Sequence, residues 1–416
     1  MGNTDRNSGR IEKMGKKKLV NISLVLLLCI FCICNRNPRE VRLEIGVFVD
    51  SGYNGENMQM TERIEKSIEE FEKKYPNVII TFESGIRRED YLEWTMGKYL
   101  TGDEPDILIL SSDVFNILAS RGGLLELEEF MTKDELFRED MFYRVGIEAG
   151  QYENRQYALP VEADPTIMCV NTTLLQKNKI VIPPSDWTWS DFHAICRQTT
   201  KDTDGDGIVD QFGVCNYTWR DAVYSNGEML FDEDGSENYL NDQDVINAVN
   251  YVYKIQMLNG GKEVEEQEFV NGNVAFMPMS LEDYHKAITY PYGSEGYKGF
   301  SWQYTTMPAG PKGKNISQVK VLQAGISRRS KKAELAWEFL KILGGGNCSK
   351  EESGTGEAEL LDLVMEDGVV VSEFPGYEEA IKRMDDGVEQ AMKSERNIRA
   401  SILTLQKEID SFLKNE

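Results

Sequence analysis

Residues 41–50 read VRLEIGVFVD, a segment in which every second side chain is apolar, as in a β-strand with one buried face. From Ile64 to Tyr75, apolar residues follow one another at spacings of 4, 3 and 4, which is the stripe of an amphipathic helix. Pro76 ends that helix, because its ring lacks an N–H and clashes with the preceding turn. This stretch therefore predicts a strand followed by a helix, the first half of a βαβ unit.

The alternation of strand and helix patterns continues along the chain. Residues 78–82 predict a second strand, and residues 107–110 are apolar throughout, which is typical of a strand buried on both faces. A second α/β set runs from Tyr157 to about Phe300, and apolar residues of segment 398–412 repeat at helical spacings of 4, 3, 4 and 3. Two α/β lobes are the simplest fold that accounts for this order.

Composition narrows the classes of function. The chain has 416 residues, with 46 Lys plus Arg against 70 Asp plus Glu, and its formal net charge is −24. A surface this acidic repels phosphate, so nucleic acid is excluded as a partner. The hydrophobic fraction of 41% is that of a globular protein. Only His193 and His285 are present, which excludes multi-histidine metal sites and leaves little room for a Ser-His-Asp triad.

The N-terminus has its own character. Residues 1–34 carry six Lys or Arg against two Asp or Glu, a charge of 6 − 2 = +4, so the remainder carries −28. The apolar run 19–34 would span roughly 24 Å as a helix, short of the ~30 Å hydrocarbon core. It predicts a secretory signal, and Cys29, Cys32 or Cys34 would be the lipidated residue of a bacterial lipoprotein. The small residue that usually precedes such a cysteine is missing, so an uncleaved signal anchor is the alternative.

Four cysteines lie beyond that segment: Cys169, Cys196, Cys215 and Cys348. They show no CxxC pair and no regular spacing, which excludes a metal framework. Each has apolar neighbours, so we expect buried small hydrophobic residues, with a disulfide as the alternative in an exported protein.

An Asp-rich run follows the spacing of a calcium loop. Asp202, Asp204, Asp206 and Asp210 stand at positions 1, 3, 5 and 9, with a glycine at position 6. Position 12 is Gly213 in place of the bidentate Glu, which excludes a full EF-hand. The run therefore predicts either a calcium site made by the four aspartates or a plain Asp/Gly turn that leads into a strand.

Nine local patterns, in order along the chain, resemble the sugar-binding family of extracellular solute-binding proteins of ABC importers, which includes the maltodextrin-binding proteins. They are DSGYNG at 50–55, FEKKYP at 71–76, PDIL at 105–108 leading to GLL at 123–125, YALP at 157–160, WTW at 187–189 with DF at 191–192, the Asp-rich run 202–213, FVNG at 269–272 before AFM at 275–277, PAGP at 308–311 and AWEFL at 336–340.

The resemblance implies a two-lobed α/β fold of the periplasmic-binding-protein type II, with a hinge between the lobes. Residues 41–156 and 304–346 would form the N-terminal lobe, and residues 157–303 and 347–416 the C-terminal lobe. The chain would cross near Pro160 and again near Tyr304, and the ligand would lie in a cleft that closes by hinge motion.

The resemblance also implies carboxylate and hydroxyl ligands for a sugar. Asp50, Ser51 and Tyr53 match a family loop that contacts sugar, although the segment could form only a turn. Asp113 matches a family carboxylate, with capping of the next helix as the alternative. Glu162, with Asp164 beside it, falls at the crossover, where the family places another ligand carboxylate.

Aromatic candidates complete the expected site. Tyr217 and Trp219 look like the aromatic platform of the second lobe, with packing in the lobe core as the alternative. The family's Trp after the strand that ends near Met279 is absent, and Tyr284 is the nearest aromatic residue. Phe374 and Tyr377 fall where the family brings a C-terminal aromatic side chain to the cleft.

These patterns predict an exported, membrane-tethered and monomeric solute receptor that binds an oligosaccharide unchanged and delivers it to the transmembrane subunits of an ABC permease. No catalytic cofactor is expected, and calcium is the only ion that the sequence suggests. The alternatives are a glycan-active enzyme that uses two of the four carboxylates Asp50, Asp113, Glu162 and Asp164, a receptor for a non-sugar solute, and a calcium-dependent sensory or adhesive module.

Overall fold

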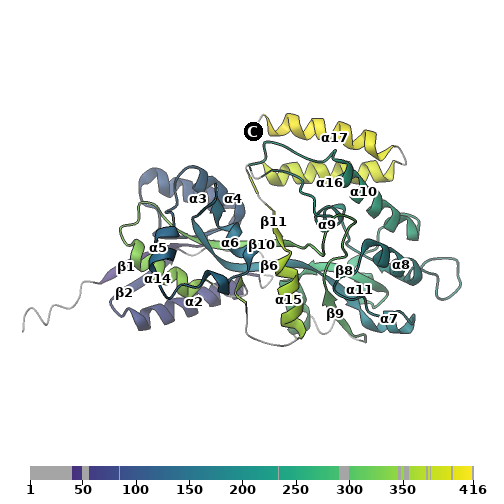
Figure 1. The fold of residues 1–416 in the computed structure, drawn as a ribbon, viewed down its shortest axis with the longest axis horizontal. Helices are drawn as coiled ribbons and strands as arrows, with labels where there is room; N and C mark the ends of the chain where they lie inside the picture. Colours follow the sequence, from purple (N-terminus) through teal and green to yellow (C-terminus); the bar gives the residue numbers. More distant parts are fainter. Residues whose placement is uncertain are drawn as a thin grey trace, which may run out of the picture.

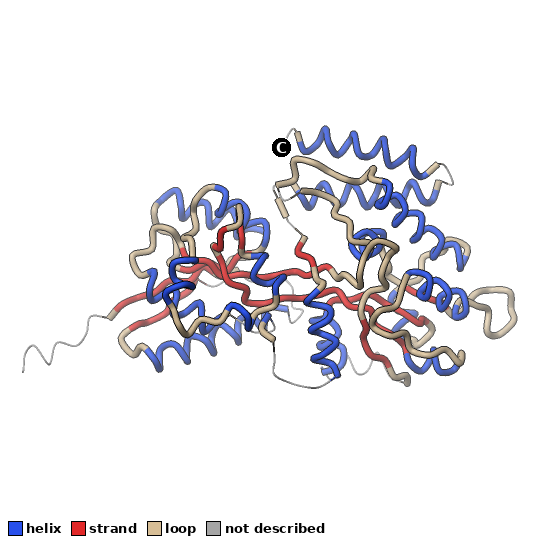
Figure 2. The backbone as a smooth tube through the Cα atoms, in the orientation of Figure 1, coloured by secondary structure: helices blue, strands red, loops and turns tan. Residues whose placement is uncertain are grey.

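The computed structural model describes residues 40–48, 60–83, 85–232, 234–288, 299–344, 348–350, 356–371, 373–374, 376–394 and 397–414, and the backbone alone of 56–59 and 289. Two α/β lobes lie side by side and are joined by strands that run through both (Figures 1 and 2). The predicted α/β fold with two lobes is therefore confirmed. Asp50, Ser51 and Tyr53, and the N-terminal segment 1–34, lie outside the described residues.

One large sheet forms the centre of the molecule, in the strand order β2-β1-β3-β10-β6-β8-β7, with β11 paired to β10 and β9 paired to β6. The strands are β1 (Val41–Gly46), β2 (Val78–Glu83), β3 (Ile107–Leu110), β6 (Ala158–Asn171), β7 (Phe212–Val214), β8 (Val274–Ser280), β9 (Trp302–Thr305), β10 (Gln318–Ile326) and β11 (Val369–Val370), and a separate hairpin pairs β4 (Gln151–Tyr152) with β5 (Arg155–Gln156).

The first lobe is built from βαβ units, as the pattern of residues 41–110 predicts. Strand β1 pairs in parallel with both β2 and β3, and β3 is fully buried. In helix α2, Ile64 and Phe71 are buried against this sheet. The helices of this lobe are α2 (Glu56–Lys74), α3 (Arg88–Thr101), α4 (Ser112–Ser120), α5 (Glu128–Lys133), α6 (Arg144–Ala149) and α14 (Ala333–Leu343), with the 3-10 turn η1 (Glu139–Met141).

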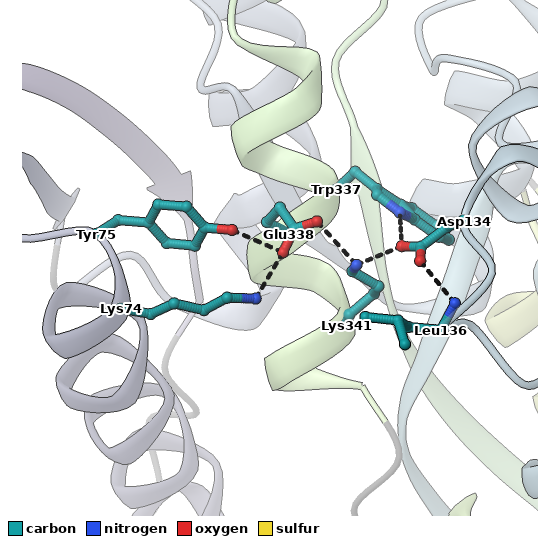
Figure 3. A network of polar contacts seen from close by, with 7 residues as sticks. All are labelled: Lys74, Tyr75, Asp134, Leu136, Trp337, Glu338 and Lys341. Atoms are coloured by element: carbon teal, nitrogen blue, oxygen red, sulfur yellow. Dashed lines mark hydrogen bonds and ion pairs between the residues drawn. The ribbon is translucent and has the colours of Figure 1, made fainter.

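A polar network fastens α14 to the rest of the first lobe (Figure 3). Glu338 accepts hydrogen bonds from Lys74 at 2.9 Å, from Tyr75 at 2.8 Å and from Lys341 at 2.8 Å. Lys341 also pairs with Asp134, which accepts a further hydrogen bond at 2.9 Å from the indole of Trp337. The network therefore satisfies both carboxylates with donors from the chain itself.

The second lobe surrounds the other end of the sheet with a larger hydrophobic core. Its predicted C-terminal helix is confirmed, with Ile402, Leu405 and Ile409 buried. The helices are α7 (Thr172–Lys177), α8 (Trp189–Thr199), α9 (Trp219–Ser225), α10 (Gln243–Gln256), α11 (Glu266–Val270), α12 (Leu281–Thr289), α15 (Gly356–Glu366), α16 (Tyr377–Lys393) and α17 (Ile398–Leu413), with the 3-10 turn η2 (Met257–Asn259).

Two long strands carry the chain between the lobes. The first half of β6 pairs with β10, and its second half pairs with β8 and β9. Because β9, which contains Tyr304, pairs with the second half of β6, the return to the first lobe lies beyond Tyr304, within β10. The register of the β6–β10 pair shifts between Leu322 and Gln323, so the crossing region carries an irregularity in its ladder.

The two faces of the crossing strands differ in chemistry. On one face, Ala163, Val319 and Val321 are buried in a hydrophobic cluster with residues of α6 and α15. Because successive side chains of a strand point to opposite faces, Glu162 and Asp164 lie on the other face and are half-buried. The apolar face stabilises the crossing, and the polar face carries the two carboxylates.

Cys169, Cys196, Cys215 and Cys348 are all buried, as predicted, and no disulfide joins them within the described chain. Among the described residues, no helix is both long enough and apolar enough to cross a membrane.

Candidate ligand-binding cleft

A cavity of about 1160 Å³ lies where the two lobes meet. Residues of both lobes and of the crossing strands line it, and its volume is somewhat above the roughly 300–1,000 Å³ that is usual for a site of a drug-sized ligand. It adjoins the carboxyl end of β3, where Ile109, Ser111 and Ser112 line it. Ligands of open α/β sheets bind at such strand ends.

The floor of the cleft is formed by the crossing strands. Glu162, Asp164 and Thr166 alternate along one face of β6, and all three line the cavity. Lys320 of β10 stands opposite Asp164 in the register, and Ser280 of β8 stands opposite Thr166. Strand pairing therefore brings carboxylates, hydroxyls and an ammonium group to one surface.

The floor carboxylates are difficult to ionise. Burial raises the pKa of Glu162, and the charges of Glu282 and Asp164 add to this rise while Arg63 opposes it. Burial also raises the pKa of Asp164 to about 6, against the hydrogen bond of 3.0 Å that it accepts from the backbone N–H of Glu282. Burial and the charge of Asp113 likewise raise the pKa of Glu373, another lining residue.

The two walls differ. On the first lobe, Phe48, Met60 and Arg88 line the cavity, and the Arg88 guanidinium lies 5.6 Å from the centre of the Phe48 ring. On the second lobe, the wall comes from the segment after β7 and from α16, which contributes Tyr377 and several carboxylates. The first wall is mostly apolar and cationic, and the second is mostly acidic.

Asn216 marks the second wall with an unusual backbone. Its φ is 58°, a left-handed conformation that Asn tolerates better than most residues. It lines the cleft together with Thr218, Arg220 and Asp221. Thr218 and Asp221 form a capping box that begins α9, so Asp221 is already satisfied within the fold.

The structure places the predicted carboxylates unequally. Glu162 and Asp164 line the cleft, as the crossover interpretation predicts. Asp113, in the first turn of α4, is not among the lining residues, although its neighbours Ser111 and Ser112 are, and it accepts a hydrogen bond from the Ser111 hydroxyl. The N-cap position of α4 is held by Ser111, so the alternative role of Asp113 as that N-cap is wrong.

The predicted aromatic platform lies inside the second lobe and does not line this cleft. Tyr217 and Trp219 are buried in the core, and they border a separate cavity of about 740 Å³. The indole N–H of Trp219 donates to Asp385 at 2.8 Å. Both residues follow β7 and lie at the end of that strand, but their rings point into the lobe. The alternative interpretation, packing in the lobe core, is therefore confirmed for both.

Tyr284 and Phe374 are also core residues. Tyr284 is 4% exposed and packs edge-on against Trp302 and Tyr304. Phe374 is 5% exposed and packs against Phe231 and Tyr377. Their assignment as cleft side chains is therefore corrected: among the described residues, the aromatic side chains that line the cleft are Phe48 and Tyr377.

Sequence reasoning missed several charged lining residues, among them Arg88, Arg220, Lys320 and Glu373. Lys320 reaches the cleft because β10 pairs antiparallel with β6, and no local pattern indicates that pairing. Glu373 follows β11, which pairs with β10 at the crossing. Only a prediction of the strand order in the sheet would have placed Lys320 and Glu373 in the cleft.

The Asp-rich loop lies between α8 and β7 and projects from the second lobe, away from the first (Figure 1). Carboxylate oxygens of Asp202, Asp204 and Asp210 come within 4.8 Å of one another, and Asp206 is not part of this group. Asp202 accepts hydrogen bonds from the backbone of Gly205 at 2.6 Å and of Gly207 at 2.8 Å. The geometry of a turn is thus present, and calcium at this loop stays a prediction.

Two α/β lobes that share a sheet and enclose a cleft at their junction define a protein that holds a small solute between its lobes. The chain belongs to the family described as bacterial extracellular solute-binding protein, whose model matches residues 57–345.

Solved structures share this fold at low sequence identity. The sugar-binding protein MalE from Xanthomonas citri matches with a TM-score of 0.74 and 14% identity, covering 90% of this chain and 98% of its own. The cyclic α-maltosyl-1,6-maltose binding protein from Arthrobacter globiformis matches with a TM-score of 0.71 and 14% identity, covering 90% and 100%. An ABC substrate-binding protein from Listeria monocytogenes in complex with cycloalternan matches with a TM-score of 0.64 and 17% identity, covering 90% and 99%.

Proposed function

We propose that this protein is the substrate-binding component of an ABC importer, which captures a carbohydrate in the inter-lobe cleft and delivers it to a membrane permease. The observation that carries the proposal is the cleft itself, a cavity of about 1160 Å³ floored by hinge strands and lined by carboxylate, hydroxyl and amide groups. Such groups bind sugar hydroxyls in a desolvated site. The sugar-binding names of the structural neighbours support carbohydrate as the solute class.

Binding would be coupled to closure of the lobes. The floor residues Glu162 and Asp164 belong to the strand that crosses between lobes, while Arg88 and Arg220 come from opposite walls. A ligand that contacts both walls stabilises the closed state by the difference between its affinities for the closed and open forms. Reopening at the permease then releases the solute without chemical change.

Further parts of the proposal concern location and assembly. The basic and apolar N-terminal segment supports export, with a lipid or signal anchor at residues 19–34 that tethers a monomer to the outer face of a bacterial membrane. The transmembrane subunits of the permease would then meet the receptor at the cell surface. Labelling of cells with radioactive palmitate, with Cys29, Cys32 and Cys34 each changed to Ser, tests the lipid anchor.

A thermal-shift screen of the purified full chain against mono- and oligosaccharides tests the main proposal. A bound sugar raises the melting temperature by mass action, and calorimetry then gives its affinity. Mass spectrometry of the recovered sugar separates a receptor from a glycan-active enzyme, because only the receptor returns the ligand intact. Absence of any shift with the carbohydrate panel would contradict the proposal.

A further inference from the structure

We infer that the solute carries positive charge as ammonium groups, so that among carbohydrates the cleft selects amino sugars over neutral sugars. That the ligand is a carbohydrate rests on the proposed function. That the ligand is positively charged rests on the residues that line the cleft.

The cleft is richer in carboxylates than the chain as a whole. Ten of its lining side chains are Asp or Glu, and the lining cations are Arg88, Arg220, Lys320 and Lys382. This ratio of ten to four exceeds the ratio of 70 to 46 for the whole chain. The cleft lining is thus at least as acidic as the chain as a whole.

Some of these carboxylates are already neutralised within the fold. Asp385 accepts the indole N–H of Trp219 and pairs with Arg220 at 3.2 Å. Glu282 pairs with Lys286 at 2.8 Å, and Glu379 pairs with a neighbouring arginine on α16. These groups are structural and leave little charge for a ligand.

Glu162 and Glu373 differ from that group. Both are half-buried in the cleft, and neither side chain accepts a hydrogen bond or forms an ion pair with any described residue. Lys320 stands opposite Asp164 in the sheet, yet forms no ion pair with that carboxylate. Arg63 uses its guanidinium to donate to the backbone oxygen of Val161. The nearby cations thus leave Glu162 and Glu373 without an ion-pair partner among the described residues, whereas Asp164 accepts a hydrogen bond from the backbone N–H of Glu282.

Half-buried carboxylates without partners are costly, since burial weakens their hydration. The hydroxyls of a neutral sugar can donate hydrogen bonds to them but bring no compensating charge. An ammonium group offers three donors and a full positive charge. Glu162 and Asp164 are two residues apart on one face of β6, roughly 7 Å along the strand, so one or two amines can contact both.

The lining offers little alternative to charge. Neutral sugars are commonly held by stacking on aromatic faces, but among the described lining residues only Phe48 and Tyr377 are aromatic. Phe48 already carries Arg88 over its ring, and Tyr377 packs against Phe374 and Phe231. Charge pairing is therefore the stronger source of affinity that this surface provides.

The test uses ligands that share one backbone and differ in charge. Calorimetry of the full chain at neutral pH compares a glucosamine trimer, the same trimer with every amine acetylated, and cellotriose. We expect the glucosamine trimer to bind at least tenfold more tightly than either neutral trimer. Its affinity should fall as NaCl is raised, because salt screens charge pairing in an open cleft. Neutral trimers that bind as tightly as the amine would overturn the inference while leaving carbohydrate transport standing.

Variants locate the effect. Glu162→Gln and Glu373→Gln keep the side-chain shape, and each should weaken binding of the glucosamine trimer about tenfold. Glu359→Gln, on the exposed face of α15 outside the cleft, is the matched control and should bind as the unmodified protein does. Equal affinity in both cleft variants and the control would also overturn the inference.

Spermidine separates the charge of the ligand from its class. Binding of spermidine with no binding of any sugar would contradict the carbohydrate proposal and support the charge inference. Binding of neither spermidine nor the glucosamine trimer would refute the inference.

Discussion

Two groups of carboxylates in this protein have opposite surroundings. In the first lobe, the hydrogen bond from Lys341, aided by Trp337, lowers the pKa of Asp134 to about 2. Burial alone would raise the pKa of Glu338, but hydrogen bonds from Lys341, Lys74 and Tyr75 outweigh it and lower the pKa to about 2. In the cleft, by contrast, burial raises the pKa of Asp164 to about 6. Asp134 and Glu338 pair with the ammonium group of Lys341, whereas Asp164 has no ion-pair partner among the described residues, and its hydrogen bond from the backbone N–H of Glu282 does not outweigh burial.

The largest expected effect comes from breaking the paired group. In Lys341→Met, both Asp134 and Glu338 lose their shared ammonium donor, and we expect the free energy of unfolding to fall by about 2 kcal/mol. Urea denaturation measures the change. Lys393→Met removes an exposed pair with Glu389 and is the control, which should unfold as the unmodified protein does. Equal stability of Lys341→Met and Lys393→Met would contradict the structural role of the network.

The stabilisation by the paired carboxylates should also depend on pH. The pKa values of Asp134 and Glu338 are lower in the folded state than in the unfolded chain, so their stabilisation is complete above pH ~4 and is lost as pH falls toward about 2. We therefore expect the stability gap between the unmodified protein and Lys341→Met to narrow over this interval. Denaturation curves at several pH values measure it, and a gap that stays constant would show that the two carboxylates do not depend on Lys341.

The unpaired group should respond in the opposite way. In Glu162→Gln, a half-buried charge without a bonded partner is removed, so the melting temperature should stay the same or rise while ligand affinity falls about tenfold, or ~1.4 kcal/mol. Calorimetry and thermal denaturation of the same preparation measure both. A fall in melting temperature together with unchanged affinity would assign Glu162 to the fold and remove it from the site.

The smallest expected effect concerns the Asp-rich loop, a third acidic group at the surface. If Asp202, Asp204 and Asp210 hold calcium, the ion should raise the melting temperature by about 1–2 °C, and Asp204→Asn should abolish the rise. Asp206→Asn is the control, because Asp206 lies outside the group whose oxygens converge. The same melting temperature with calcium and with chelator would leave the loop as a plain turn.

Much of the fold could be predicted from local patterns. The strand at 41–46, the buried strand 107–110 and the C-terminal helix each carry a period that matches their burial. The residues of the candidate site were harder to predict from the sequence. Glu162 and Asp164 were predicted because the resemblance places a ligand carboxylate at the crossover, but the inward direction of Tyr217 and Trp219 depends on how α9 packs. Lys320 and Glu373 reach the cleft through the pairing of β10 with β6 and β11, which local sequence does not encode.

Strand β6 has one more consequence, for the way the protein unfolds. Its fourteen residues contribute to the hydrophobic clusters of both lobes, with Leu159 and Val161 in one and Met168 and Val170 in another. If one lobe unfolded alone, half of this strand would lose its packing and its strand pairing while the other half kept both. We therefore expect the lobes to unfold as a single cooperative unit, with calorimetric and van't Hoff enthalpies that agree, even though the proposed closure of the cleft would move them as separate bodies.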